Sequence, residues 1–345
     1  MRLFLSRTGY KLPCLLECSF PMVRPPQLLA HLSRVQRASH ADIRTALPLL
    51  PHERTVARWY RELGDQLVIF PTFTLAPLGL GHMHVFLPDA DPAWLRFPYA
   101  VDHAWLTQDF SHRCLYLHCV VPLAHRDDVV QFVHDFGGER PVVISSGEGV
   151  QDLPLLGAPP TVAAAPRSTE VLHTFPLVVP VIFEGWNRRT SLPQLWRRVD
   201  ERLGSHLREY CPRRRRELTS PVTAAYARLT AEGLFRQHAI RYTAFVKDTV
   251  EVLAVLADPA LVDALRLHAV SIEEYEGSPH VVRLVGTNGL LEAFLSLPAG
   301  AVQVYFVQKH DCPCVRFCYE FLFLPKTGSW VFSREHLVQH LWGTP

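Results

Sequence analysis

The chain has 345 residues, of which 48% are hydrophobic and 20% are charged. This composition excludes a wholly disordered chain, and the length predicts two or three domains rather than one. Because 35 Lys and Arg residues face 33 Asp and Glu residues, the net charge is only +2 and points to no class of partner. Only the distribution of charge along the chain is informative.

Targeting and membrane-spanning patterns are not found in the sequence. Arg7, Lys11 and Glu17 interrupt the first apolar stretch, which argues against a secretory signal peptide. The best apolar run, residues 175–183, is too short for a bilayer and predicts a strand. We therefore expect a cytoplasmic protein without a membrane partner.

A winged helix-turn-helix is predicted for residues 26–74, after an extension over residues 1–25. Val56, Trp59 and Leu63 share one face of its third helix. Three short helices with a tight turn before the third, followed by a ribbon, are typical of this motif. The predicted elements are helices at 27–35, 40–47 and 52–63, with Ser39 as N-cap of the second, and a β-ribbon at 67–74.

The order β-α-β-β-α-β is predicted for residues 75–146. Alternating apolar residues indicate its strands, and apolar residues at helical spacing indicate the helix that begins at His125. The predicted elements are a strand at 81–87, a helical turn at 92–97, strands at 101–108 and 114–121, a helix at 125–136 and a strand at 140–145.

The second half of the chain repeats this organisation, which predicts a duplication. Residues 147–189 form a linker and a strand, with the part up to Ser168 rich in Pro, Ala and Gly. Residues 190–245 predict a second winged-helix module with helices at 191–207 and from 220 to at least 229 and a wing at 239–245. Residues 246–308 predict a second βαββαβ unit, with strands at 249–256, 268–275, 280–285 and 301–307 and helices at 259–265 and 288–297.

A C-terminal hairpin and helix are predicted for residues 309–345, with strands at 315–324 and 329–332 and a helix at 333–342. Three thiols and an imidazole at the start of this segment form a tetrahedral zinc ligand set. Because they are not spaced as two separated pairs, buried thiols or a disulfide are the alternative. The candidate metal ligands are His310, Cys312, Cys314 and Cys318.

A winged helix followed by a βαββαβ unit resembles the Lrp/AsnC family of transcription regulators. The resemblance is carried by the segments 38–43, 52–63 and 78–81, and Thr55 and Arg58 fit the recognition helix of that family. It implies that the αβ units pair, within one chain or as a homodimer, and read a small-molecule effector. The chain departs from the family by being doubled, by its two extensions, and by having residues 108–112 where the family has a glycine-aspartate turn.

Positive charge gathers in the two modules that resemble DNA-binding domains. Residues 24–65 hold seven arginines and four acidic residues, and residues 188–217 hold ten arginines and four acidic residues. Such local basic patches are typical of nucleic-acid binding, although a solvated charged face or a charged loop is the alternative. The candidate DNA-binding residues are Ser39, His52, Arg54, Thr55, Arg58, Arg61, Arg213, Arg214, Arg215 and Arg216.

An enzyme is the rival hypothesis, because the chain holds 18 histidines. It has no HExxH, GxSxG, Walker or GxGxxG motif in a suitable context. Siroheme decarboxylases are similar to Lrp/AsnC proteins and can be two fused units that bind a tetrapyrrole with histidine and arginine. In this chain His103, His112 and Arg113 lie in the corresponding region and are the candidate ligand-binding residues; each histidine alone is more often a structural strand residue.

We therefore predict an α+β protein, with two repeats of a winged helix-turn-helix followed by a ferredoxin-like βαββαβ domain. Its predicted function is sequence-specific regulation of transcription through double-stranded DNA, without catalysis and without a cofactor. A tetrapyrrole decarboxylase and a protein-interaction protein are the two alternatives.

Overall fold

The computed structural model describes most of the chain beyond residue 66. It covers residues 67–107, 113–152, 171–185, 192–211, 219–242, 250–298, 300–307 and 317–343. The first predicted helical module, residues 26–66, lies outside the described residues, as do the extension 1–25, the segment 212–218 and the segment 308–316. Within the described part, no helix is long and apolar enough to cross a membrane.

The first βαββαβ unit has the predicted order, with boundaries within two residues of those expected. Its elements are β2 (Leu80–Pro88), η2 (Pro92–Arg96), β3 (Ala100–Thr107), β4 (Arg113–Pro122), α4 (Arg126–Phe136) and β5 (Val142–Ser146). Two 3-10 turns, η1 (Ala76–Leu78) and η3 (Leu123–His125), precede β2 and α4.

The second unit repeats the order. Its elements are β8 (Val250–Leu256), α10 (Leu261–Arg266), β9 (Ala269–Tyr275), β10 (His280–Gly286), α11 (Asn288–Ser296) and β11 (Val302–Val307). The α+β class and the duplicated ferredoxin-like order predicted from the sequence are therefore confirmed.

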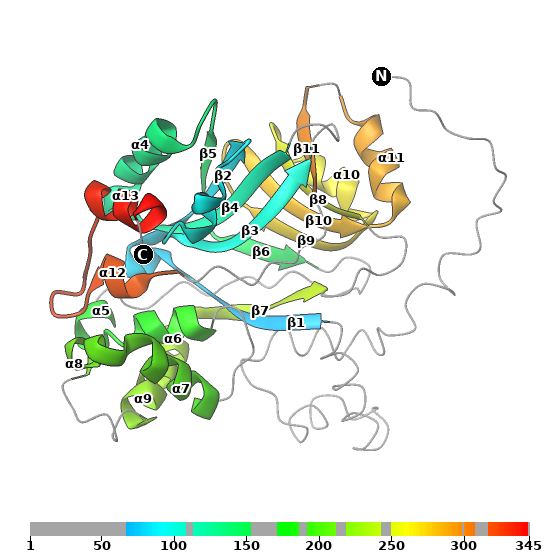
Figure 1. The fold of residues 1–345 in the computed structure, drawn as a ribbon. Coiled ribbons are helices and arrows are strands. Elements are labelled where there is room, and N and C mark those ends of the chain that lie inside the picture. Colours follow the sequence, from blue (N-terminus) through cyan, green and yellow to red (C-terminus); the bar gives the residue numbers. More distant parts are fainter. Residues whose placement is uncertain are drawn as a thin grey trace, which may run out of the picture.

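The two units share one nine-stranded sheet, in the order β5-β2-β4-β3-β11-β8-β10-β9-β6. They meet where β3 pairs with β11, through Thr107 opposite Phe306 and Leu106 opposite Val307. The edge strands β5 and β6 (Gly149–Asp152) follow each other in the chain, so the sheet must curl to bring its edges together. Figure 1 shows this curl, with α4 at one end of the sheet and α10 and α11 at the other.

Strand β6 corrects the prediction of a linker over residues 147–168. Residues Gly149 to Asp152 pair antiparallel with β9. A Cβ on Gly149 would lie 2.5 Å from Cε1 of Tyr275, so a glycine is needed for this close approach of the two strands. The glycine that made the segment resemble a linker is thus part of the sheet.

Side chains alternate along the strands between an outer face of the sheet, which helices cover, and an inner face. In the second unit Val252, Leu284 and Phe294 belong to an outer core beneath α10 and α11. Inside the curl, Phe86 of the first unit stacks on Tyr305 of the second, with ring centroids 5.0 Å apart. The inner faces of the two repeats therefore pack against each other.

A two-stranded ribbon joins the halves outside this sheet. Strand β1 (Leu67–Phe73) pairs antiparallel with β7 (Phe235–Tyr242) along its whole length. The sequence predicted a separate ribbon at 67–74 and a separate wing at 239–245, whereas each of the two modules contributes one strand to a shared pair. Each of the two strands provides hydrogen-bond partners for backbone amides and carbonyls of the other strand.

The second helical module contains helices at the predicted places. Its elements are α5 (Val171–Thr174), α6 (Val178–Gly185), α7 (Leu192–Leu203), η5 (Gly204–His206), α8 (Leu207–Tyr210) and α9 (Thr219–Ala231). Helix α6 corrects the strand predicted at 175–183. Its β-branched run favours a strand, but all eight residues are buried among α7, α9 and α12, and burial overrides propensity. Pro180 lies in the first turn, where the amide hydrogen has no helical partner to lose.

The C-terminal segment contains α12 (Tyr319–Leu322), β12 (Phe323–Leu324), β13 (Ser329–Trp330) and α13 (Arg334–Trp342). The predicted strand over 315–324 is wrong for residues 319–322, which form a helical turn that buries Tyr319 and Leu322. The final helix is confirmed, and the Ser333 hydroxyl caps it by accepting from the amide of His336.

Candidate functional site

Three histidines lie together on the inner face of the first unit. On β2, His82 and His84 alternate with Met83 and Val85, which point into the outer core. Strand β4 places His118 directly opposite His84. All three imidazoles are at least 95% buried, and buried polar side chains need hydrogen-bond partners.

His84 has a partner at each ring nitrogen. Its Nδ1 lies 2.8 Å from the hydroxyl of Tyr116, and its Nε2 lies 2.9 Å from the Ser146 hydroxyl. Burial, and then the nearby His82, lower the pKa of His84 well below its ordinary value. This imidazole therefore stays neutral at physiological pH, donating at one nitrogen and accepting at the other.

His82 and His118 form a second pair. Nδ1 of His82 lies 2.9 Å from Nε2 of His118, and the two rings stack with centroids 5.1 Å apart. The His118 ring also stacks on His84, at 5.2 Å. The three imidazoles thus form a continuous group.

The second unit closes the group with an aromatic ring. Tyr275 of β9 packs edge-on against His82, His84 and His118, with centroids 5.5, 4.6 and 5.0 Å away. Its hydroxyl donates to Glu273 at 2.6 Å. We call His82, His84, His118, Tyr116 and Tyr275 the histidine cluster; both repeats contribute to it.

Glu148 connects the cluster to the surface. It lies between the edge strands β5 and β6 and is about one quarter exposed, and its Oε2 lies 3.4 Å from Nε2 of His82. Its Oε1 accepts from the amides of Leu75 and Ala76, at 2.6 and 3.2 Å. Burial raises the pKa of Glu148, but His82 and the two amides outweigh it and lower that pKa.

A second polar group lies beside the cluster, because its Asp102 is the direct cross-strand neighbour of His118. The Arg283 guanidinium of β10 contacts Glu251 at 2.5 Å and Asp102 at 2.8 Å. Asp102 belongs to the first repeat, so this buried ion pair joins the units. Burial alone would lower the pKa of Arg283, but Glu251, Asp102 and Glu273 outweigh it and raise that pKa.

The predicted ligand-binding residues do not belong to the histidine cluster. His103 pairs with Leu117 across β3 and β4 and therefore lies on the outer face. Arg113 is exposed at the first residue of β4, and His112 lies outside the described residues. The structure thus brings together His82, His84 and His118, none of which is among the three predicted ligand-binding residues.

A sequence signal for the cluster existed. His82 and His84 are two residues apart in a run that reads as a strand, and such residues share a face. The same two-residue spacing places Tyr116 and His118 on one face of β4. The missing information was which face turns inward, because both faces of these strands are buried.

The predicted DNA-binding residues lie outside the described residues. This holds for Ser39, His52, Arg54, Thr55, Arg58, Arg61 and Arg213 to Arg216. Helix α9, the predicted second recognition helix, is described: Val222, Ala225 and Leu229 are buried. Its exposed positions carry hydroxyl and methyl side chains, at Thr219, Ser220, Thr223, Ala224, Ala227, Thr230 and Ala231.

Several arginines in the second basic stretch, and Arg228 beyond it, make internal contacts. Arg228 is the only charged residue of α9, and it pairs with Glu232 at 2.5 Å. Arg202 of α7 is 10% exposed and pairs with Glu320 at 2.8 Å, and Arg198 donates to the carbonyl of Glu184. These cations are therefore engaged within the protein.

The proposed metal ligands are mostly outside the described residues, which include only Cys318 of the four, as a half-buried cysteine. In the described part of the chain, no three His, Cys, Asp or Glu side chains are arranged to hold a metal ion. Elsewhere in the described part of the chain, Cys114, Cys119 and Cys211 are buried cysteines that form no disulfide.

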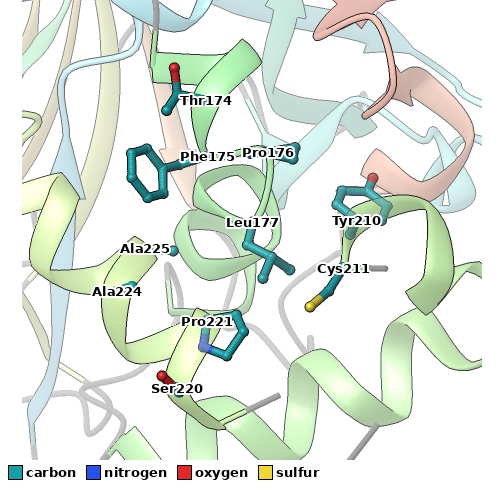
Figure 2. Close-up of a pocket in the computed structure, with 10 residues that line it drawn as sticks. All are labelled: Thr174, Phe175, Pro176, Leu177, Tyr210, Cys211, Ser220, Pro221, Ala224 and Ala225. Carbon is teal, nitrogen blue, oxygen red and sulfur yellow. The ribbon is translucent and has the colours of Figure 1, made fainter. Parts of the chain in front are cut away.

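A cavity of about 280 Å³ lies in the second helical module, away from the histidine cluster (Figure 2). Phe175, Leu177, Pro221 and Ala225 make it largely apolar. The Tyr210 hydroxyl points away from the Cys211 sulfur in this view. The cavity therefore offers little to a ligand that carries carboxylates.

Comparisons with known proteins give a distant structural likeness. No family model matches the chain, and no curated protein matches it. Two crystal structures of the siroheme decarboxylase NirDL align at 15% identity. One holds an iron-uroporphyrin III analogue and gives a TM-score of 0.43, covering 86% of this chain and 95% of that one. The other gives 0.45, covering 91% and 98%.

Proposed function

We propose that this protein is an enzyme whose histidine cluster performs acid–base chemistry between the two αβ units, with a carboxylate-bearing tetrapyrrole as its substrate. The observation that carries the proposal is the bond between Tyr116 and His84 inside a group of three contacting imidazoles. Buried titratable groups with perturbed proton affinity are typical of catalytic sites.

The chemistry of a decarboxylation fits such a cluster. Loss of CO₂ from an acetate side chain breaks a carbon–carbon bond, and its electron pair must be captured by a proton, leaving a methyl group. A general acid supplies that proton when a donor is held in place. The Tyr116 hydroxyl is such a donor, and neutral His84 orients it through the 2.8 Å contact.

The substrate class follows from the resemblance to siroheme decarboxylases that the sequence indicates. Arg113 is exposed at the start of β4, but it shares the strand face of Leu115 and Leu117, opposite to that of Tyr116 and His118. Recognition of a carboxylate by Arg113 therefore stays a prediction from the sequence. We assign the cluster to proton transfer.

The second helical module supports the enzyme over the regulator. A recognition helix reads base edges with donor and acceptor side chains and approaches phosphates with cations. Helix α9 presents threonine, serine and alanine, and its single cation, Arg228, is paired with Glu232. DNA binding by the first module, through Arg54 and Arg58, remains a prediction from the sequence.

One titration separates the two functions. Siroheme is added to the purified protein, and its absorbance band and the release of CO₂ are measured. We expect a spectral shift and CO₂ release, with release lost in Tyr116→Phe and His84→Phe but kept in His134→Ala, an exposed histidine of α4. No shift, together with DNA affinity that falls steeply with salt and is lost in an Arg54/Arg58→Glu double variant, would overturn the enzyme and restore the regulator.

A further inference from the structure

We infer that Glu148 is the positioning residue of the histidine cluster, fixing the tautomers of His82 and His118 and thereby the direction in which a proton moves from solvent to the interior. The inference rests on the proposed function, since it assigns a role within that site. It depends on the geometry of three side chains and two backbone amides.

The first step is that Glu148 is held as an acceptor. Two amide hydrogens, from Leu75 and Ala76, point at its Oε1. A carboxylate that accepts backbone hydrogen bonds is stabilised in its ionised form. Its other oxygen, which faces His82, therefore carries no proton to donate.

The second step assigns the tautomer of His82. Because an ionised carboxylate only accepts, the His82 Nε2 that faces it at 3.4 Å must carry a hydrogen. In the neutral ring Nδ1 is then an acceptor. Nδ1 lies 2.9 Å from Nε2 of His118, so His118 must be the donor at that contact.

The third step follows a proton along this chain. In the assigned tautomers both rings carry hydrogen at Nε2, which is the state that an inward transfer leaves behind. Such a transfer begins with hydrogen on Nδ1 of both rings: His82 takes up a proton at Nε2, beside Glu148, and its Nδ1 hydrogen passes to Nε2 of His118, whose Nδ1 hydrogen is released to the interior. Each ring gains one proton and loses one, so the transfer balances. By accepting from Nε2 of His82, Glu148 stabilises the end state of this transfer.

The surroundings of His82 favour this route. In the described part of the chain, the groups around it include His118 of β4, Glu148, the Tyr275 ring of β9 and His84 on its own strand, with Glu273 bonded to the Tyr275 hydroxyl. Of these, Glu148 is the one at the surface end, and His84 is kept neutral. Solvent protons therefore reach the cluster at Glu148.

The test begins with the unmodified protein and needs no substrate. Nitrogen-15 NMR of histidine-labelled protein, assigned with His82→Gln and His118→Gln variants, reports which nitrogen of each ring carries hydrogen. We expect both His82 and His118 to be protonated at Nε2 at pH 8. Hydrogen on Nδ1 of neutral His82 would overturn the inference, whether or not the protein binds a tetrapyrrole.

Substitution provides the second arm. Glu148→Gln removes the charge and keeps the shape, and Glu276→Gln, an exposed neighbour, is the matched control. We expect Glu148→Gln to mix the His82 tautomers and to lower kcat about 100-fold with KM unchanged, as for loss of an acid–base contribution. Unchanged tautomers in Glu148→Gln refute the positioning role, whereas tautomers that change in a protein without decarboxylase activity refute only the proposed reaction.

Discussion

Replacing Arg283 with methionine is expected to destabilise the barrel-like sheet far more than loss of a surface cation. Arg283 is 13% exposed and contacts Glu251 and Asp102, which are 17% and 16% exposed. Methionine fills similar space without charge, so the variant leaves two half-buried carboxylates without their shared cation. The perturbation therefore tests electrostatics rather than packing.

The magnitude follows from the geometry. Unit charges about 4 Å apart attract by about 4 kcal/mol at an effective dielectric constant near 20, and Arg283 has two such partners. Desolvation of the three groups cancels much of this attraction in the native protein. Once the cation is gone, leaving the two carboxylates in place costs about 3–5 kcal/mol of unfolding free energy.

Urea denaturation followed by circular dichroism measures this loss, with Arg126→Met as control. Arg126 pairs with an exposed neighbour at 3.8 Å, and its removal should leave the midpoint nearly unchanged. A variant as stable as the wild type at pH 8 would refute the assignment of a buried, charged bridge between the repeats.

Three further outcomes are expected. The folded pKa of His84 lies below the unfolded value of 6.5. The contribution of neutral His84 to stability is therefore complete above pH 6.5 and is lost as the pH falls, by up to about 1.4 kcal/mol per pH unit. A His84→Gln variant should flatten the dependence of the urea midpoint on pH. Gly149→Ala should cost about 1–3 kcal/mol in urea denaturation and displace the Tyr275 ring, seen as changed histidine NMR shifts. Trp342→Ala should cost about 1–3 kcal/mol in urea denaturation, because that ring packs on Trp94 at 6.0 Å.

The duplicated fold could be predicted because its signal is local and occurs twice. Strands such as 81–87 and 280–285 alternate or run apolar, and the turns between them contain glycine or proline. Residues 178–185 could not be predicted in this way. Their β-branched composition favours a strand, and only the surrounding α7, α9 and α12 make a buried helix the better solution.

The candidate site was harder to predict than the fold for a physical reason. His82 and His84 could be assigned to one strand face from their spacing, but their partners Glu148 and Tyr275 come from segments far apart in the sequence. Curling of the sheet brings these segments together. Glu148 was predicted to be in a linker, since the glycines around it resemble those of a flexible connection.

The two repeats have the same order of elements but place different chemistry on the inner face. The first unit contributes imidazoles at His82, His84 and His118, whereas the second contributes Arg283 and Tyr275. A symmetric homodimer of one such unit would place two identical sets opposite each other, because a twofold axis repeats every side chain. Fusion into one chain removes that constraint and allows an asymmetric interior, in which the imidazoles of the first repeat lie beside an ionic bridge to the second.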